Sequence, residues 1–274
     1  MSEAHFIRSF PAAFDETPHP YLQGWPAPPP ERARRHGCAW PKLAVTVSES
    51  VETRSLRGSP ATGFDTELQR IRDLVLTMGD DVDEAMTRAT EGLVDRDVDV
   101  CAAVIRDDAR INALLVTVRE VAFDAIAHAP APPQLREALG LLHMASELER
   151  MGDHCASIAK SGRELADLPP LSSQFDLPQL SEACEVQVRD ILGALIARDV
   201  DRARAIAARD DRVNRIHHRI VDDLIQLMAE DGGAVFRGTK LIMVAQNFER
   251  IGDRVTNLAE DLIFLESGRI EELG

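Results

Sequence analysis

Apolar residues recur at every third or fourth position through most of the chain beyond residue 64. This spacing is typical of amphipathic α-helices, whose apolar face must be buried against other helices. No alternation of apolar and polar residues of useful length is present in this region, so we expect no β-sheet. The pattern predicts an all-α protein with six long helices, at about 64–93, 97–129, 134–165, 180–197, 200–229 and 238–267.

Two stretches of the chain are nearly identical. Residues 147–160 read ELERMGDHCASIAK, and residues 247–260 read NFERIGDRVTNLAE. The matches extend upstream, where the sequence RDVD at residues 96–99 returns at residues 198–201. Several matches at nearly constant spacing indicate that one unit of about 100 residues is present twice.

Each copy of the unit holds three of the predicted helices. Short connections make consecutive helices antiparallel neighbours, which favours a three-helix bundle in each copy. We therefore expect two tandem three-helix bundles, at residues 64–168 and 169–274.

Residues 1–63 differ from the rest of the chain. They contain 9 of the 15 prolines, both tryptophans and the single tyrosine, and they show little apolar periodicity. Such a composition cannot bury enough apolar surface to fold, so we expect a disordered Pro-rich N-terminal extension. An alternative is that a Pro-rich segment at about 23–30 serves as a docking site.

Composition narrows the class of function. The chain has 46 acidic and 31 basic residues and a net charge of −15, which disfavours nucleic acid as a partner because phosphate binding needs clustered Lys and Arg. No stretch approaches the ~20 apolar residues of a membrane span, and the first residues lack the apolar block of a secretory signal. The four cysteines form no CxxC pair, which favours reduced thiols in the cytoplasm.

The repeated polar residues are candidate metal ligands. At ~100° per residue, Glu149 and Asp153 lie far from the apolar stripe of their helix and face away from the core. Carboxylates at i and i+4 repel one another, and a hard divalent or trivalent cation such as iron, zinc, manganese or magnesium would reverse the sign of that interaction. We expect two such surface sites, formed by Asp108, Asn112, Glu149 and Asp153 and by Asp210, Asn214, Glu249 and Asp253.

Other interpretations of these residues stay open. Charged residues off an apolar stripe are mostly just solvated, and Arg150 and Arg250 can neutralise the carboxylates locally. Mid-helix Gly152 and Gly252 fit either close helix packing or room for an ion. The chain has no phosphate-binding loop, dinucleotide fingerprint, HExxH or GxSxG motif, so we expect a protein that is not an enzyme.

The repeated motifs resemble those of the PhoU family, regulators of phosphate uptake. Members of that family have two tandem three-helix bundles, each with a Glu/Asp-x-x-x-Asp motif in its third helix and an Asp-x-x-x-Asp/Asn motif in its second. The matching positions here are those of the two candidate sites, and the resemblance covers about residues 64–267.

The resemblance implies metal clusters at these motifs, a homodimer, and a cytoplasmic protein that damps phosphate import. It also implies contact with the ATPase of a phosphate transporter and with a phosphate-sensing histidine kinase. The leading hypothesis is thus a regulatory adaptor without direct membrane insertion. The alternatives are an acidic metalloprotein with redox or hydrolytic activity and a purely structural bundle.

Two departures from the family pattern bear on the sites. Asn112 and Asn214 stand where some relatives have Asp, which lowers the negative charge of each site. Asn247 stands where the first copy has Glu147. Because ligand charge tunes metal affinity, we expect the two sites to differ in affinity.

Overall fold

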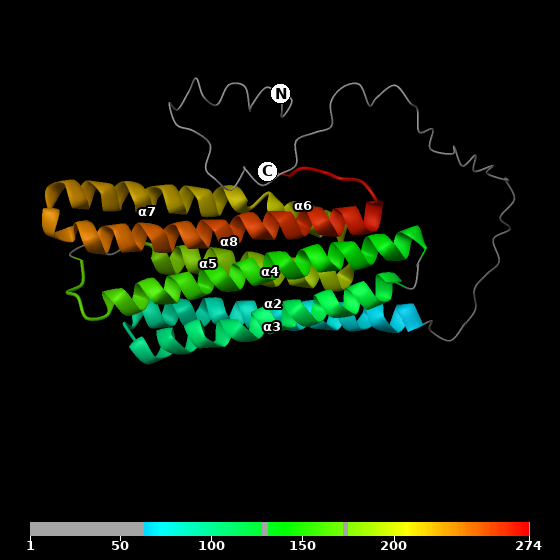
Figure 1. The fold of residues 1–274 in the computed structure, drawn as a ribbon. Helices are drawn as coiled ribbons and strands as arrows, with labels where there is room; N and C mark the ends of the chain where they lie inside the picture. Colours follow the sequence, from blue (N-terminus) through cyan, green and yellow to red (C-terminus); the bar gives the residue numbers. More distant parts are fainter. Residues whose placement is uncertain (1–62, 128–130, 172–174, 274) are drawn as a thin grey trace, which may run out of the picture. The chain divides into compact units, whose positions relative to one another are not determined.

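The protein folds as a set of long α-helices packed side by side in the computed structural model (Figure 1). The structure describes residues 63–127, 131–171 and 175–273, and no residue in these ranges forms a β-strand. The predicted all-α fold is confirmed, whereas the predicted N-terminal extension lies outside the described residues. In chain order the helices are α2 (Gly63–Val94), α3 (Val98–Ala127), α4 (Pro132–Leu165), α5 (Leu177–Ala197), α6 (Val200–Ala207), α7 (Asp210–Glu230), the short 3-10 helix η3 (Gly232–Ala234) and α8 (Val235–Ser267).

The helix predicted at about 200–229 is interrupted, which corrects the sequence-based boundary. The chain leaves helix α6 at Ala208, and α7 begins at Asp210. The amide of Arg209 bonds to the carbonyl of Ile206 at 2.9 Å, a tight i to i+3 contact in place of the α-helical one. The guanidinium of Arg209 turns toward Asp190 of α5, with Nη1 2.5 Å from Oδ2. The equivalent helix of the first repeat, α3, is continuous.

Prolines begin helix α4 rather than merely ending the helix before it. Pro132 and Pro133 occupy its first positions, two residues earlier than the predicted start. A proline is favourable there because its missing N–H group has no intrahelical partner in the first turn. The side chain of Gln134 bonds back to the amide of Ala131 and closes the N-terminus.

Both repeats turn into their second helix in the same way. Arg96 and Arg198 have positive φ angles of 60° and 55°, the left-handed conformation that ends a helix. The next residue then caps the following helix. Asp97 Oδ1 accepts from the amides of Asp99 and Val100, and Asp199 Oδ1 accepts from the amide of Arg202.

The two repeats pack against each other through their first and third helices. Helices α2, α3 and α4 contact one another. In the second repeat α5, α6 and α7 each contact α8, and α5 also contacts α6 and α7. The contacts of α4 with α8 and of α2 with α5 join the two groups. Figure 1 shows α4 and α8 lying side by side. One cluster of buried apolar residues extends through both repeats. None of the described helices carries an apolar stretch long enough to cross a membrane.

The packing of α2 on α5 follows the internal repeat. Thr90 Oγ1 of α2 lies 2.6 Å from Ser181 Oγ of α5, and Gly79 of α2 lies against the side chain of Leu192 of α5. Residues 79 and 181, and residues 90 and 192, are equivalent positions at the repeat spacing of 102. The two contacts therefore join the same pair of equivalent positions, with the roles of α2 and α5 exchanged. This symmetry establishes the register between the first helices of the two repeats.

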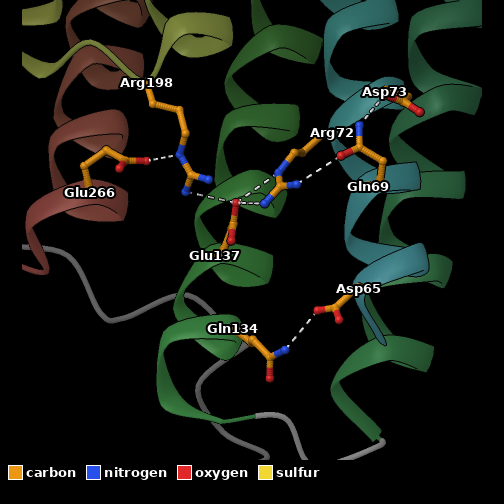
Figure 2. Close-up of polar contacts among 8 residues, drawn as sticks. All are labelled: Asp65, Gln69, Arg72, Asp73, Gln134, Glu137, Arg198 and Glu266. Carbon is orange, nitrogen blue, oxygen red and sulfur yellow. Dashed lines mark hydrogen bonds and ion pairs between the residues drawn. The ribbon is translucent and has the colours of Figure 1, made fainter. Parts of the chain in front are cut away.

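A chain of ion pairs crosses this junction at one end of the bundle (Figure 2). Glu137 of α4 accepts hydrogen bonds from Arg72 of α2 and from Arg198, which follows α5. Arg198 also donates to Glu266 near the end of α8. Figure 2 shows the four side chains in a row, so the Arg198 turn contacts both repeats.

The cysteines within the described residues are free thiols. Cys101, Cys155 and Cys184 are all buried, and Cys38 lies outside the described ranges. Burial raises the pKa of the Cys155 and Cys184 thiols well above the ordinary value, so both stay protonated. The Cys184 thiol donates to the carbonyl of Phe248 at 3.3 Å.

Candidate metal centres

The first cluster of predicted ligands forms where α3 and α4 run side by side. Asp108 and Asn112 lie on α3, and the Asn112 amide donates to Asp108 Oδ2 at 3.2 Å. Glu149 and Asp153 lie one turn apart on α4, at the part of its surface that faces Asp108. Of the four side chains, Asp153 is exposed and the other three are half-buried.

The second cluster repeats this arrangement between α7 and α8. The Asn214 amide donates to Asp210 Oδ2 at 2.7 Å, and Glu249 and Asp253 lie one turn apart on α8. All four residues are half-buried. Because of the break in the helix at Arg209, Asp210 is the first residue of α7, whereas its equivalent Asp108 lies well inside α3.

Mutual repulsion marks each cluster as a site of concentrated negative charge. Burial raises the pKa of Asp108 above its ordinary value, and Asp153 raises it further. Burial also raises the pKa of Glu149, and Asp153 and Asp108 add to that shift. The structure thus brings together residues from two helices that the sequence had grouped only by their repetition.

The second cluster shows the same electrostatic behaviour. Burial raises the pKa of Asp210, with a further contribution from Asp253. The pKa of Glu249 is raised by burial and by the carboxylates of Asp253 and Asp210. A positive ion would lower these pKa values, because it favours the charged form of each ligand.

Glycine makes room for the carboxylate of the neighbouring helix in both clusters. A Cβ atom on Gly152 would lie 3.2 Å from Asp108 Oδ1, and one on Gly252 would lie 2.8 Å from Asp210 Oδ1. Both carboxylate oxygens are buried and have no hydrogen-bond partner among the described residues. Buried polar atoms are normally paired, so an unpaired oxygen in each cluster indicates a missing donor or cation.

These observations fit a hard cation in the chemistry of the ligands. Carboxylate and amide oxygens suit iron, manganese, magnesium or zinc, and each cluster has an orphaned oxygen beside a glycine. In the described part of the chain, however, no three His, Cys, Asp or Glu side chains already stand close enough to share an ion. Coordination of an ion would therefore require the carboxylates on α4 and α8 to change rotamer. The exposure of Asp153 permits such a change in the first cluster.

Glu147 does not contribute to the first cluster, so the expected affinity difference cannot come from its exchange for Asn247. Glu147 is buried between α4 and α8, where Oε2 accepts from Arg254 at 3.1 Å and from Asn257 at 2.7 Å. The equivalent contact, with the partners exchanged, pairs Asn247 Oδ1 with His154 Nδ1 at 3.0 Å. Both pairs join the third helices of the repeats.

Three residues near the clusters do not belong to the predicted sets of ligands. Lys160 lowers the pKa of Asp108, and His218 lowers that of Glu249, so both side chains act on their clusters. Gln187 lies close to Asp210, since a Cβ on Gly252 would meet its Oε1 atom at 3.8 Å. The signal that could have identified them is a difference between the two copies, because Lys160, Gln187 and His218 have Glu260, Ala85 and Val116 at the equivalent positions.

Comparison of the chain with known proteins identifies its family. The family model of the PhoU domain matches the chain twice, at residues 75–162 and 177–262. The two matches contain the two clusters, one in each. The chain belongs to the PhoU family.

Relatives of known description cover most of this PhoU chain. It is 31% identical over 213 residues to a "Phosphate-specific transport system accessory protein PhoU homolog" of Zymomonas mobilis subsp. mobilis, covering 77% of this chain and 90% of that protein. A protein of the same description from Aquifex aeolicus is 33% identical over 205 residues, covering 74% and 93%.

Solved structures of PhoU proteins have the same fold. The phosphate transport system regulatory protein PhoU from Streptococcus pneumoniae matches with a TM-score of 0.72 at 27% identity, covering 77% of this chain and all of that one. PhoU from Pseudomonas aeruginosa also matches with a TM-score of 0.72, at 28% identity and covering 75% of this chain. The resemblance expected from the ERxGD repeats is confirmed.

Proposed function

We propose that this chain is a regulatory adaptor, without enzymatic activity, of phosphate uptake and phosphate-starvation signalling. The observation that carries the proposal is the double match to the PhoU domain over residues 75–162 and 177–262. The relatives are described as accessory proteins of the phosphate-specific transport system, and one solved relative is described as its regulatory protein. The adaptor acts by contact, damping import when phosphate is plentiful.

The proposed partners are the ATPase of a phosphate transporter and a phosphate-sensing histidine kinase. Both contacts lie on the cytoplasmic side of the membrane, where the chain acts as a homodimer. The acidic surface supports a protein partner rather than nucleic acid, because the net charge of −15 repels phosphate backbones.

Metal ions form part of the proposed function. Asp108, Glu149 and Asp153 would hold cations in the first repeat, with Asn112 orienting Asp108 through its hydrogen bond. Asp210, Glu249 and Asp253 would do so in the second repeat, with Asn214 in the same role. A bound cation would neutralise repelling carboxylates and join two helices of each bundle, which stabilises the surface that a partner contacts.

Affinity capture tests the adaptor proposal. Tagged full-length protein is recovered from gently solubilised cells grown in high and in low phosphate, and the bound proteins are identified. We expect a transporter ATPase or a sensor kinase to be enriched, with an amount that depends on phosphate. Failure under both conditions, with the bait folded and dimeric, would refute the adaptor and direct attention to redox or hydrolytic activity.

A paired variant connects the clusters to partner binding. Glu249→Gln with Asp253→Asn removes two charges from the second cluster and should reduce capture. The matched control is Asp222→Asn with Asp223→Asn, which removes two carboxylates from α7 outside the cluster. Equal capture by both variants would separate the metal clusters from the adaptor function.

A further inference from the structure

Helix α7 and the start of α5 border a surface hollow lined by arginines, the arginine hollow. Its volume is about 410 Å³, and its lining residues are Gln179, Arg212, Arg215, Ile216 and Arg219. The three arginines are exposed, and no carboxylate among the described residues lines the hollow. On a chain with a net charge of −15, the hollow is a local concentration of positive charge.

Two of the three arginines have no partner for their charge. Among the described residues, the guanidinium groups of Arg212 and Arg215 make no hydrogen bond and no ion pair, not even with Asp211 one turn before Arg215. Arg219 Nη2 donates to Gln179 Oε1 at 3.3 Å, which leaves the NH₂ group of that amide available as a further donor. Like charges one turn apart repel, and a bound anion would reverse the sign of that interaction.

An ion pair with exchanged charges establishes the register for comparing the hollow with the first repeat. Arg88 of α2 pairs with Asp107 of α3 at 3.1 Å, and Arg209, which precedes α7, pairs with Asp190 of α5 at 2.5 Å. Residues 88 and 190, and residues 107 and 209, are equivalent at the repeat spacing of 102. Both repeats therefore bond the same two positions, with the signs of the charges reversed.

The neighbouring pair of equivalent positions is bonded in the first repeat alone. There, Arg110 Nε of α3 lies 3.1 Å from Asp81 Oδ2 of α2. The equivalent residues of the second repeat are Arg212 and Ala183, which line one small cleft together. Glu182 also lines that cleft, but among the described residues it makes no ion pair with Arg212. Because alanine cannot neutralise an arginine, the charge of Arg212 is left for an external anion.

The other polar residues of the hollow are specific to the second repeat. The positions equivalent to Gln179, Arg215 and Arg219 are Thr77, Ala113 and Thr117. The first repeat thus has a single arginine in this region, already paired, where the second has three. Since the first repeat packs the same helices without the other two arginines, the bundle does not require them.

We propose that the arginine hollow binds a dianionic phosphate group. Guanidinium groups present paired N–H donors that match two phosphate oxygens, and they stay charged at physiological pH. A hollow lined by charges of one sign also concentrates ions of the opposite sign. Arg212 and Arg215 would contact the anion, with Arg219 and Gln179 completing the set of donors. Free inorganic phosphate and a phosphoryl group on a partner protein share this chemistry.

The binding site stands on the arginines alone, and only its regulatory use rests on the proposed function. In a regulator of phosphate uptake, such a site would couple the chain directly to phosphate. Binding is measured without transporter or kinase, so its failure is distinct from a failure of affinity capture.

Isothermal titration calorimetry of the full-length protein tests the site, with inorganic phosphate and, separately, a short phosphoserine peptide as probes. The ionic strength is held constant with KCl because salt screens exposed charges. We expect saturable binding of at least one probe and none of the unphosphorylated peptide. Binding of inorganic phosphate would identify the free ion as a ligand, and binding of the phosphopeptide alone would identify a phosphorylated partner. If neither probe binds up to millimolar concentration, the proposal is wrong.

A matched pair of variants separates a site from a general effect of charge. Arg215→Gln should weaken binding about tenfold, the effect of losing one charge-assisted hydrogen bond. Arg110→Gln removes the paired arginine of the first repeat and should leave the affinity unchanged. Equal weakening by both variants would show a response to net charge and would overturn the site.

The variant Ala183→Asp tests why Arg212 is available. It recreates the carboxylate that Asp81 supplies in the first repeat, so it should pair with Arg212 and also weaken binding about tenfold. Helical content and thermal melting show whether each variant is folded, and Arg212→Gln, at an exposed position, replaces Ala183→Asp if the buried aspartate prevents folding. Unchanged affinity in the folded variant would overturn the role of Arg212.

Discussion

The two repeats place the same carboxylates on the same helices but surround them differently. Asp108 lies well inside a continuous helix and beside an open cleft, and the charge of Lys160 opposes the raised pKa of its carboxyl group. Asp210 begins a helix, beside a cleft that Gln187 narrows. Helix geometry maintains the spacing of the carboxylates, whereas the residues around them can diverge without disturbing the fold. A duplication can therefore yield two clusters with one helical architecture and different surroundings.

The contact between the third helices shows the same divergence. The pair of Glu147 with Arg254 is ionic and buried, whereas the equivalent pair of Asn247 with His154 is an uncharged hydrogen bond when the imidazole is neutral. Burial lowers the pKa of His154, which favours that neutral form. One half of a symmetric interface thus depends on charge, and the other half does not.

Removing one partner from each pair should produce the largest difference in stability between variants of the two repeats. Arg254→Met leaves the Glu147 carboxylate, 2% exposed, without its cation from α8 and with only the more exposed Arg150 of its own helix as a partner. We expect a loss of about 3 kcal/mol in the free energy of unfolding, against about 1 kcal/mol for His154→Met. Urea denaturation measures both.

The double variant Glu147→Leu with Arg254→Met provides the control for that experiment. Replacing a buried ion pair by apolar residues is often neutral, so the double variant should recover most of the stability. Equal losses for the two single variants would show that the charge at Glu147 has no special importance.

Asp261 should make the stability of the second repeat depend on pH. The first repeat has the non-titrating Ser161 at the equivalent position. Burial raises the pKa of Asp261 to about 6, against the hydrogen bond from His143. The stability from its protonated form is present below about pH 4 and is lost as the pH rises through 6. Asp261→Asn lacks this loss, so its stability relative to wild type should increase by about 2 kcal/mol between pH 4.5 and 7.5. Urea denaturation at the two pH values measures the difference in stability between Asp261→Asn and wild type. A difference that stays constant with pH would contradict the raised pKa of Asp261.

The two left-handed arginines offer a third, smaller contrast. Arg96 donates to the carbonyl oxygens of Leu165 and Ala166 at the end of α4, whereas Arg198 pairs with carboxylates at the surface. Glycine keeps the left-handed turn and removes only the side chain. Arg96→Gly should cost about 1.5 kcal/mol and Arg198→Gly less than about 1 kcal/mol, measured by thermal melting. The reverse order would mean that the surface network dominates.

The last contrast concerns the two cluster glycines. A Cβ atom on Gly152 would meet the flexible end of Ile111 at 2.9 Å, whereas one on Gly252 would meet the Asp210 carboxylate at 2.8 Å. Alanine favours a helix, but crowding opposes that gain. We expect Gly252→Ala to be about 1 kcal/mol less stable than Gly152→Ala when both are metal-free. Calorimetry of the two variants measures this difference. Equal stabilities would contradict the crowding of Asp210.

Several features followed from the sequence alone. The apolar spacing predicted helices at 64–93 and 134–165, and the structure has them at Gly63–Val94 and Pro132–Leu165. The repeated ERxGD motif indicated the family, and the family model matches both copies. Such features are local, because the period of a helix and the face on which a residue lies depend only on neighbours along the chain.

Other features depended on contacts between distant parts of the chain. The apolar stripe continues through residues 200–229, so nothing in its period revealed the break at Arg209, which turns toward Asp190. The role of Glu147 was misjudged because the helix that receives it lies about 100 residues away. The position of Gln187 beside Gly252 became visible only in the packed structure. The sequence by itself determined the helices, the repeat and the candidate carboxylates. Only the tertiary structure decided which side chains meet, because burial and partner distance arise when helices pack.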